Sequence, residues 1–156
     1  MENNTIEESV VTKEMRPKVG LGIVCYTTAT KEVLIGERIK NVIGIHQFPG
    51  GHIEYNETFE KCAQRELEEE TGIKAPIDEF KHVTTLNVRR PDAKYHYIVI
   101  IMSVKVDKEV KVQNLEPDKN KGWSWIKYNE LLEKEDLFYP IEVLKEQGFT
   151  KIEHFY

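Results

Sequence analysis

The most constraining feature of the sequence is a helix near the middle of the chain. Apolar side chains recur at helical spacing over residues 58–71, and Gly72 follows in the position where a left-handed residue ends many helices. On a helical wheel of about 100° per residue, these side chains gather on one face. The pattern predicts an amphipathic helix that packs Phe59, Cys62, Ala63 and Leu67 against a core.

Three carboxylates of this helix fall on or beside the same face: Glu66 and Glu70 in its middle and Glu69 at its edge. Two like charges about 4 Å apart repel by about 4 kcal/mol at an effective dielectric constant near 20, before any desolvation cost. Protonation, pairing with a basic residue or a bound divalent cation would each offset this repulsion, and only a cation uses all three acids at once.

The chemistry of these acids favours a hard metal. Carboxylate oxygens suit Mg²⁺ or Mn²⁺, and no His or Cys cluster in the sequence has zinc-like spacing. The alternative is that the acids form one end of a solvated helix whose true apolar face is rotated.

The residues before the helix favour the metal. Pro49 fixes its φ angle, and Gly50 and Gly51 permit close approach of the main chain to a ligand, so we predict a loop here. A glycine carbonyl would add a metal ligand, and bare N–H groups would meet phosphate oxygens. The alternative for the glycine pair is a tight turn into the helix.

The rest of the chain alternates strands with turns, and it ends in short helices. This order predicts one α/β domain over residues 17–156, after a loosely ordered tail over residues 1–16. The predicted strands cover residues 19–26, 32–36, 81–88, 96–106 and 122–126, and the predicted short helices cover 129–134 and 141–147.

The net charge and the length of the apolar runs limit the kinds of partner that the protein is expected to bind. A formal net charge of −5 at pH 7 disfavours attachment to long nucleic acid, which depends on cationic groups. The longest apolar stretch, residues 97–102, is far shorter than a membrane span, and the N-terminus is acidic and polar, so we expect no membrane or secretion segment. Cys25 and Cys62 lack CxxC spacing, which indicates reduced thiols and a cytoplasmic protein.

The segment from Gly51 to Ile73 carries a complete family signature. Gly51, five residues, Glu57, seven residues and then Arg65-Glu66-Leu67-Glu68-Glu69-Glu70-Thr71-Gly72-Ile73 match G-x5-E-x7-R-E-U-x-E-E-x-G-U at every position. The chain therefore resembles the Nudix hydrolases. The resemblance implies an α/β/α sandwich around a mixed β-sheet, and Mg²⁺- or Mn²⁺-dependent hydrolysis of a nucleoside diphosphate linked to another group.

The resemblance also implies roles for individual residues. The three helix carboxylates would hold the metal together with the Gly51 carbonyl, and Glu57 and Arg65 would brace the loop against the helix. Glu66 and Glu69 are candidates for the general base within the signature, and Glu116 is one outside it, with an ordinary solvated loop acid as its alternative.

Further motifs lie beyond the signature, and they include residues 47–54, Tyr95-His96-Tyr97, and Asn114-x-Glu116-Pro117 followed by Trp123-x-Trp125. On these motifs the chain resembles the eukaryotic MutT-type nucleoside triphosphate diphosphatases over about residues 16–149. This resemblance implies hydrolysis of purine or oxidised purine (deoxy)nucleoside triphosphates to a monophosphate and pyrophosphate, in a homodimer. The chain departs from these relatives at Tyr139-Pro140, where they tend to have a tryptophan.

Five residues are expected to bind substrate. Arg38 ends the second predicted strand and is a candidate phosphate contact, with an ordinary surface arginine as the alternative. Phe138 and Tyr139 are candidates for stacking on a base, with core packing as the alternative. Gln47 flanks the predicted ligand loop and is a candidate hydrogen-bond partner of the ligand, with a hydrogen bond to the loop backbone as the alternative. Gly50 lies within that loop.

Two other functions stay open. One is a pyrophosphatase for ADP-ribose or nucleotide sugars, although few residues precede the first strand to build the extra N-terminal strands usual in those relatives. The other is a catalytically silent binding module, although such proteins typically break the acidic run, which is intact here.

Overall fold

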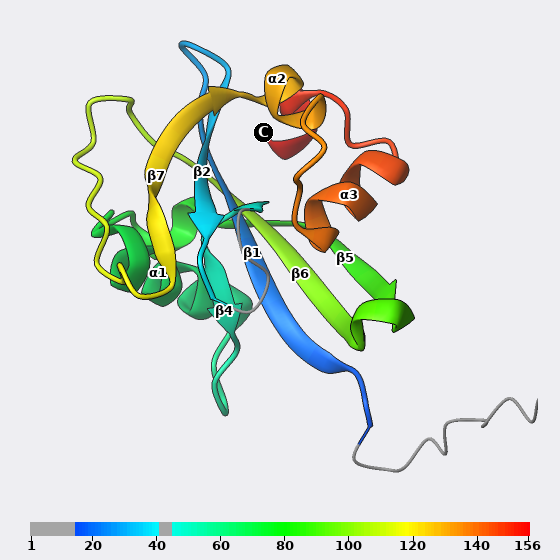
Figure 1. The fold of residues 1–156 in the computed structure, drawn as a ribbon. Helices are drawn as coiled ribbons and strands as arrows, with labels where there is room; N and C mark the ends of the chain where they lie inside the picture. Colours follow the sequence, from blue (N-terminus) through cyan, green and yellow to red (C-terminus); the bar gives the residue numbers. More distant parts are fainter. Residues whose placement is uncertain (1–14, 41–44) are drawn as a thin grey trace, which may run out of the picture.

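A mixed β-sheet organises the chain (Figure 1). This computed structural model describes residues 15–40 and 45–156, and in that part of the chain the sheet has seven strands. The strand order is β3-β2-β1-β6-β5, with β4 paired to β1 and β7 to β2. The strands are β1 (Lys18–Thr27), β2 (Glu32–Arg38), β3 (His46–Gln47), β4 (Gly50–His52), β5 (Lys81–Arg90), β6 (Tyr95–Lys105) and β7 (Asn120–Lys127).

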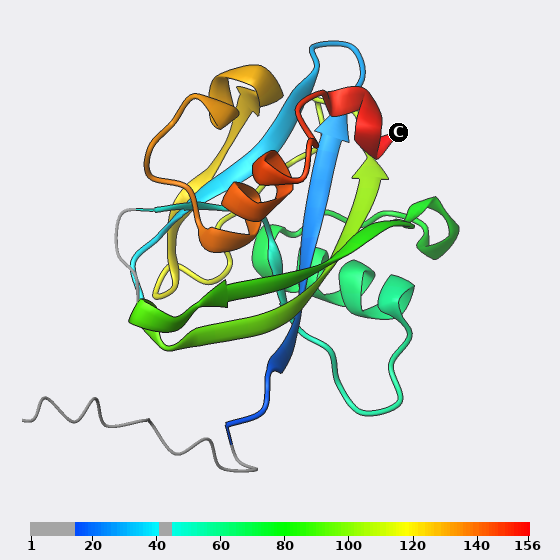
Figure 2. The ribbon, with the colours of Figure 1, turned by 90° about the vertical axis from the view of Figure 1, so that its right-hand side faces the viewer.

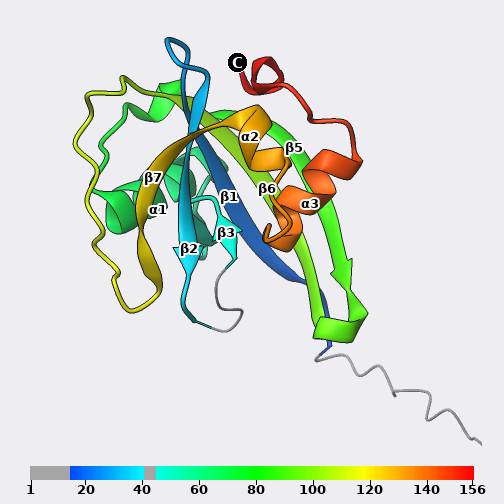
Figure 3. The ribbon, with the colours of Figure 1, turned by 45° about the horizontal axis from the view of Figure 1, so that its top comes forward.

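Strands β1 and β6 form the centre of the sheet and run parallel; Figure 3 shows β2, β1, β6 and β5 side by side in this order. Alternate side chains of a strand face opposite sides of a sheet, so each central strand serves two cores. Ile23 and Met102 pack into the core beneath the long helix, and Val24 and Ile101 pack into the core on the other face. Burial on both faces explains the long apolar run of β6.

Helices cover both faces of the sheet. The long helix α1 (Phe59–Thr71) lies against one face, and α2 (Tyr128–Leu132), α3 (Tyr139–Glu146) and the 3-10 helix η3 (Ile152–Phe155) lie against the other (Figures 1 and 2). Two further 3-10 turns, η1 (Ile77–Glu79) and η2 (Pro91–Ala93), flank β5. This arrangement confirms the predicted α/β/α sandwich.

Helix α1 begins and ends where the sequence predicts. The Thr58 hydroxyl accepts a hydrogen bond from the Lys61 N–H at 3.1 Å, which satisfies one free donor of the first turn. Gly72 adopts φ 74°, and its N–H donates to the Glu68 carbonyl at 2.9 Å. The helix is thereby fixed at the end that carries the carboxylates.

Several details of the sequence prediction were wrong. Gly50 and Gly51 are not loop residues, because they pair with Gly22 and Leu21 of β1 in the short strand β4. Phe59 was expected in the core, but it is 39% exposed, and its ring lies against the edge of the sheet at His82 of β5.

Other boundaries shift by a few residues. Strand β7 begins at Asn120, where a loop was expected, because its pairing with β2 extends to Arg38. Helices α2 and α3 begin at Tyr128 and Tyr139, one or two residues early, and α3 begins there because Pro140 fits the first turn of a helix. The expected N-terminal tail lies outside the described residues up to residue 14.

Within residues 15–40 and 45–156, no helix is long and apolar enough to cross a membrane.

Removal of the α1 cap should destabilise the protein. We expect Thr58→Ala to lower the free energy of unfolding by about 1 kcal/mol, because the Lys61 N–H loses its acceptor. Urea unfolding followed by circular dichroism measures the change. Thr58→Ser keeps the hydroxyl and should stay near wild type, and equal losses in both variants would contradict the capping role.

Candidate active site

The two glycines of β4 bring the main chain against the carboxylates of α1. A Cβ atom on Gly50 would overlap the Leu21 carbonyl of β1, and a Cβ atom on Gly51 would overlap the Glu66 carboxylate. The overlap with backbone therefore requires glycine at position 50, and a side chain at position 51 would displace the Glu66 carboxylate. This contact brings β4 together with Glu66 and Glu70, which lie in the second half of α1.

Glu70 is the most buried of the helix carboxylates that face β4. Its Oε2 accepts a hydrogen bond from the Gly50 N–H at 2.9 Å. Burial raises the pKa of Glu70 to about 8, and the negative charges of Glu66 and Glu116 act in the same direction. The pKa shift means that this carboxylate lacks sufficient positive charge around it.

Glu66 lies beside Gly51 with a side chain that is 12% exposed. Burial raises its pKa above the ordinary value, although the Arg65 guanidinium, 2.9 Å away, acts in the opposite direction. Glu69 is 52% exposed and accepts a hydrogen bond from the same guanidinium at 3.2 Å. The three carboxylates thus differ in burial along about one turn of helix.

Arg65 and Glu57 connect the helix to the residues that follow β4. Arg65 Nε donates to Glu57 Oε2 at 2.7 Å, and Arg65 Nη2 donates to the His52 carbonyl at 3.1 Å. The Arg65 guanidinium lowers the pKa of Glu57 to about 2. A buried, charge-assisted pair of this kind holds the segment around His52 against α1, as the family signature implies.

Glu116 approaches the carboxylates from outside the signature. It lies in the loop between β6 and β7, and its charge contributes to the raised pKa of both Glu66 and Glu70. Its own side chain is 28% exposed and pairs with Lys119 at 3.1 Å. The residue that sequence reasoning placed on a loop thus reaches the same region as the helix acids.

The chemistry of Gly51, Glu66, Glu69 and Glu70 fits a hard divalent cation, although the carboxylates are not arranged as a closed set of ligands. Across residues 15–40 and 45–156, no three His, Cys, Asp or Glu side chains converge closely enough to hold an ion as they stand. Two observations support the fit. The main chain at Gly51 is open to the Glu66 carboxylate, and Glu70 has a raised pKa that a nearby cation would lower.

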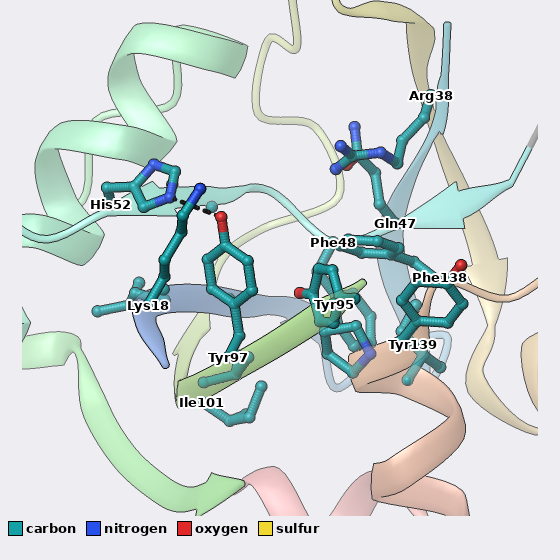
Figure 4. A pocket seen from close by; sticks show the side chains of 18 of the residues that line it. Lys18, Arg38, Gln47, Phe48, His52, Tyr95, Tyr97, Ile101, Phe138 and Tyr139 are labelled. Carbon is teal, nitrogen blue, oxygen red and sulfur yellow. Dashed lines mark hydrogen bonds between the residues drawn. The ribbon is translucent and has the colours of Figure 1, made fainter. Parts of the chain in front are cut away.

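A cavity of about 400 Å³ opens on the other side of β4 (Figure 4). Gly50 and Gly51 line it, so a single short strand separates the cavity from the carboxylates of α1. Aromatic rings form much of its wall, and its charged lining residues are the cations Lys18, Arg38 and Lys94. A cavity of this kind suits a ligand that combines a ring with negative charge.

Arg38 and Gln47 form one end of this cavity, above the aromatic rings in Figure 4. Arg38 Nη1 donates to Gln47 Oε1 at 2.7 Å, and the guanidinium lies 4.3 Å from the centre of the Phe138 ring. Arg38 Nε is buried, and no acceptor for it occurs among the described residues. The Gln47 amide accepts from Arg38 through its oxygen, so its NH₂ group and the guanidinium are the N–H donors at this end of the cavity.

The cavity brings together all five residues that the sequence analysis nominated for substrate binding, namely Arg38, Gln47, Gly50, Phe138 and Tyr139. Sequence reasoning gave no role to Lys18, Tyr95 or Tyr97, which also line it. Tyr95 stacks on Tyr97 and meets the edges of Phe138 and Tyr139. The usable signal was the alternation along β6, which places Tyr95 and Tyr97 on the face opposite α1.

Comparison with known protein families decides the assignment. Residues 16–146 match the NUDIX domain. The chain belongs to the Nudix family. Nudix hydrolases generally use a divalent metal ion, which agrees with the oxygen donors around Gly51.

Individual relatives support the Nudix assignment. Nudix hydrolase 25 of Arabidopsis thaliana is 30% identical over 137 residues, which is 76% of each chain. The crystal structure of a MutT Nudix hydrolase from Burkholderia pseudomallei has a TM-score of 0.72 at 20% identity, and covers 85% of this chain and 98% of that one. The Nudix domain of Shewanella oneidensis NrtR, solved with ADP ribose, has a TM-score of 0.70 at 16% identity, and covers 88% and 92%. The two structures show the same fold.

The buried Glu70 should make the stability of the metal-free Nudix domain depend on pH. Its pKa is raised from 4.5 to about 8. The folded state therefore keeps a proton that the unfolded state has released. The stability from this group is present below pH 4.5 and is lost as the pH rises through about 8. Glu57 contributes a pH dependence of the opposite sign, because its pKa is lowered from 4.5 to about 2. Its stabilising effect is lost only as the pH falls below 4.5 toward 2.

Glu70→Gln should remove the loss of stability that occurs as the pH rises. In EDTA at about pH 8, the variant should therefore have a higher free energy of unfolding than wild type. Urea unfolding between pH 4.5 and about 8 measures it. Glu68→Gln, half-exposed on the same helix, is the matched control and should follow wild type. An unchanged pH slope in Glu70→Gln would refute the assigned burial effect.

Proposed function

We propose that this Nudix domain hydrolyses (deoxy)nucleoside triphosphates, with a purine or oxidised purine base, to a nucleoside monophosphate and pyrophosphate. The observation that carries the proposal is that strand β4 is shared by two half-sites, the α1 carboxylates and the aromatic cavity. The α1 carboxylates meet one side of Gly50 and Gly51, and the aromatic cavity meets the other. The polyphosphate and the base would thus be held on opposite sides of the same strand, β4.

Glu66, Glu69, Glu70 and the Gly51 carbonyl would hold Mg²⁺ or Mn²⁺. When bound, the ion supplies positive charge to the phosphoryl oxygens and lowers the pKa of water. The pairs of Arg65 with Glu57, Glu66 and Glu69 keep these carboxylates oriented toward β4. Arg65 therefore acts on the site through its neighbours and does not need to touch the substrate.

The chemical step is the attack of a water oxygen on phosphorus, with cleavage of the bond to the pyrophosphate oxygen. A carboxylate oxygen must accept the proton of that water. Among the three candidates, Glu66 and Glu69 already accept hydrogen bonds from Arg65. Glu116 also accepts a hydrogen bond, from Lys119 Nζ at 3.1 Å. Glu66 and Glu69 are already proposed to hold the metal, so we assign the proton acceptor to Glu116.

The base would lie in the aromatic cavity, against Phe138, Tyr139 and Tyr95. The donors at its Arg38 and Gln47 end favour a base edge that carries acceptors, such as the carbonyl oxygen and ring nitrogen of guanine. This is consistent with the resemblance to the eukaryotic MutT-type enzymes. The amino group of adenine at the same position would meet a donor instead of an acceptor.

The second candidate function is hydrolysis of ADP-ribose. The observation that favours it is the similarity to the Shewanella oneidensis NrtR domain solved with ADP ribose. A homodimeric assembly, a cytoplasmic location and a single domain over residues 17–156 remain part of the proposal.

A substrate panel separates these candidates. The protein is incubated with Mg²⁺ and dGTP, oxidised dGTP, dATP, ADP-ribose or capped RNA, and products are separated by ion-exchange chromatography. We expect pyrophosphate from the guanine triphosphates and less from dATP. AMP from ADP-ribose as the main product would favour the second candidate. No turnover of any compound would indicate a silent binding module.

The aromatic cavity should control affinity more than turnover. Phe138→Leu keeps apolar volume but removes the ring, and base stacking contributes about 1–3 kcal/mol, so KM for the best triphosphate should rise about fivefold or more with kcat little changed. Steady-state kinetics measure both constants. Tyr55→Leu, a fully exposed aromatic outside the cavity, is the control. An unchanged KM in Phe138→Leu would refute base binding there.

A further inference from the structure

The loop that carries Glu116 is attached to the end of α1. The Gln113 N–H donates to the Thr71 carbonyl at 2.8 Å, and the Leu115 N–H donates to the Glu70 carbonyl at 3.2 Å. The Trp123 indole N–H donates to the same Glu70 carbonyl at 3.2 Å. These bonds bring the loop close to the carboxylates, but none of them fixes the direction of the Glu116 side chain.

A ring of hydrogen bonds encloses the residues around Glu116. The Glu116 carbonyl accepts from the Lys119 N–H at 3.0 Å and from the Asn120 N–H at 3.2 Å, which forms a single helical turn. Asn114 Nδ2 then donates to the Asn120 carbonyl at 2.7 Å. The two asparagines thereby join the beginning and the end of the turn, with Glu116 between them.

Asn120 anchors this turn in the sheet. It is 3% exposed, and its Nδ2 donates to the Gly122 carbonyl at 3.2 Å. Its amide occupies space left by Gly36 of β2, because a Cβ on Gly36 would lie 2.6 Å from Asn120 Nδ2 and 2.8 Å from the Trp123 ring. The position of the turn therefore depends on a glycine that is far away in the sequence.

The two asparagines are poorly explained by stability alone. The Oδ1 atoms of Asn114 and Asn120 are both buried, and neither has a partner among the described residues. Buried polar atoms without a partner are costly, and apolar side chains would avoid the cost. A role in holding a neighbouring side chain in place would explain why asparagine occupies both positions despite this energetic cost.

We propose that Asn114 and Asn120 are positioning residues, which hold Glu116 at the α1 carboxylates through the turn that Gly36 accommodates. The inference rests on the proposed function, because it assigns the proton acceptor to Glu116. It adds that this acceptor is oriented by a hydrogen-bonded loop that is separate from the family signature.

The test compares Asn114→Ala, Gly36→Ala and Glu116→Gln with wild type on the best substrate of the panel. A misplacement of about 1 Å can cost about 100-fold in rate, so we expect Asn114→Ala and Gly36→Ala each to lower kcat about 10- to 100-fold while KM stays near wild type. Asn114→Ala should add nothing in the Glu116→Gln background, since the two residues act as one unit. Asn87→Ala, which removes an exposed amide contact to His96, is the matched control.

Amide hydrogen exchange of the metal-free protein gives a readout that does not need turnover. In Asn114→Ala the Lys119 and Asn120 N–H groups should exchange faster than in wild type and in Asn87→Ala, while α1 keeps its protection. This result supports the hydrogen-bonded turn even if no panel substrate is hydrolysed.

Three results would overturn the inference. The first is a wild-type kcat in Asn114→Ala and Gly36→Ala, and the second is an equal further loss when Asn114→Ala is added to Glu116→Gln. The third is full activity of Glu116→Gln, which removes the assigned role of Glu116 while hydrolysis itself stands. If wild type hydrolyses no panel substrate, the proposed function is refuted. If, in addition, hydrogen exchange at the Lys119 and Asn120 N–H groups is unchanged in Asn114→Ala, the positioning role of Asn114 is refuted as well.

Discussion

The contact between the Gly50–Gly51 main chain and the carboxylates of α1 is the constraint on which the site depends. It places Glu66 and Glu70 away from water, where two acids cost energy unless one is protonated or a cation is near. The Gly50 N–H and the Arg65 guanidinium compensate this charge in part, and the raised pKa of Glu70 shows that the compensation is incomplete. The fold thus maintains a site of excess negative charge at one strand.

The sheet makes this contact possible by dividing the partners of β1 along its length. Gly20–Gly22 of β1 pair with β4 and Tyr26–Thr27 pair with β2, while β6 runs parallel to β1 over residues 18–26. One face of the sheet supports α1 and therefore the carboxylates, and the other supports α3 and therefore Tyr139 and the aromatic cavity. Two chemically different half-sites are consequently separated by a single layer of backbone, and the cationic lining of one of them would offset the net negative charge of the protein toward the proposed nucleotide.

Sequence alone predicted the elements whose signals are local. The α1 boundaries followed from Thr58 and Gly72, and the apolar run of β6 indicated a central strand. The local signal failed at Gly50 and Gly51, which sequence reasoning assigned to a loop, because their strand pairing depends on Gly20–Gly22 of β1. The Nudix signature supplied the residues of the α1 half-site, but the Asn114, Asn120 and Gly36 contacts were out of reach, since they join positions that share no periodicity. The same holds for Lys18, which lines the cavity because its position in β1 is in register with Tyr97 of β6.

The most direct test of the central claim is a crystal structure with Mn²⁺ and a non-hydrolysable nucleoside triphosphate, in which anomalous scattering locates the ion. The account predicts an anomalous peak bounded by the Gly51 carbonyl and by Glu66, Glu69 and Glu70, with the base beside Phe138 and Tyr139. An ion held elsewhere, with the α1 carboxylates directed into solvent, would contradict it.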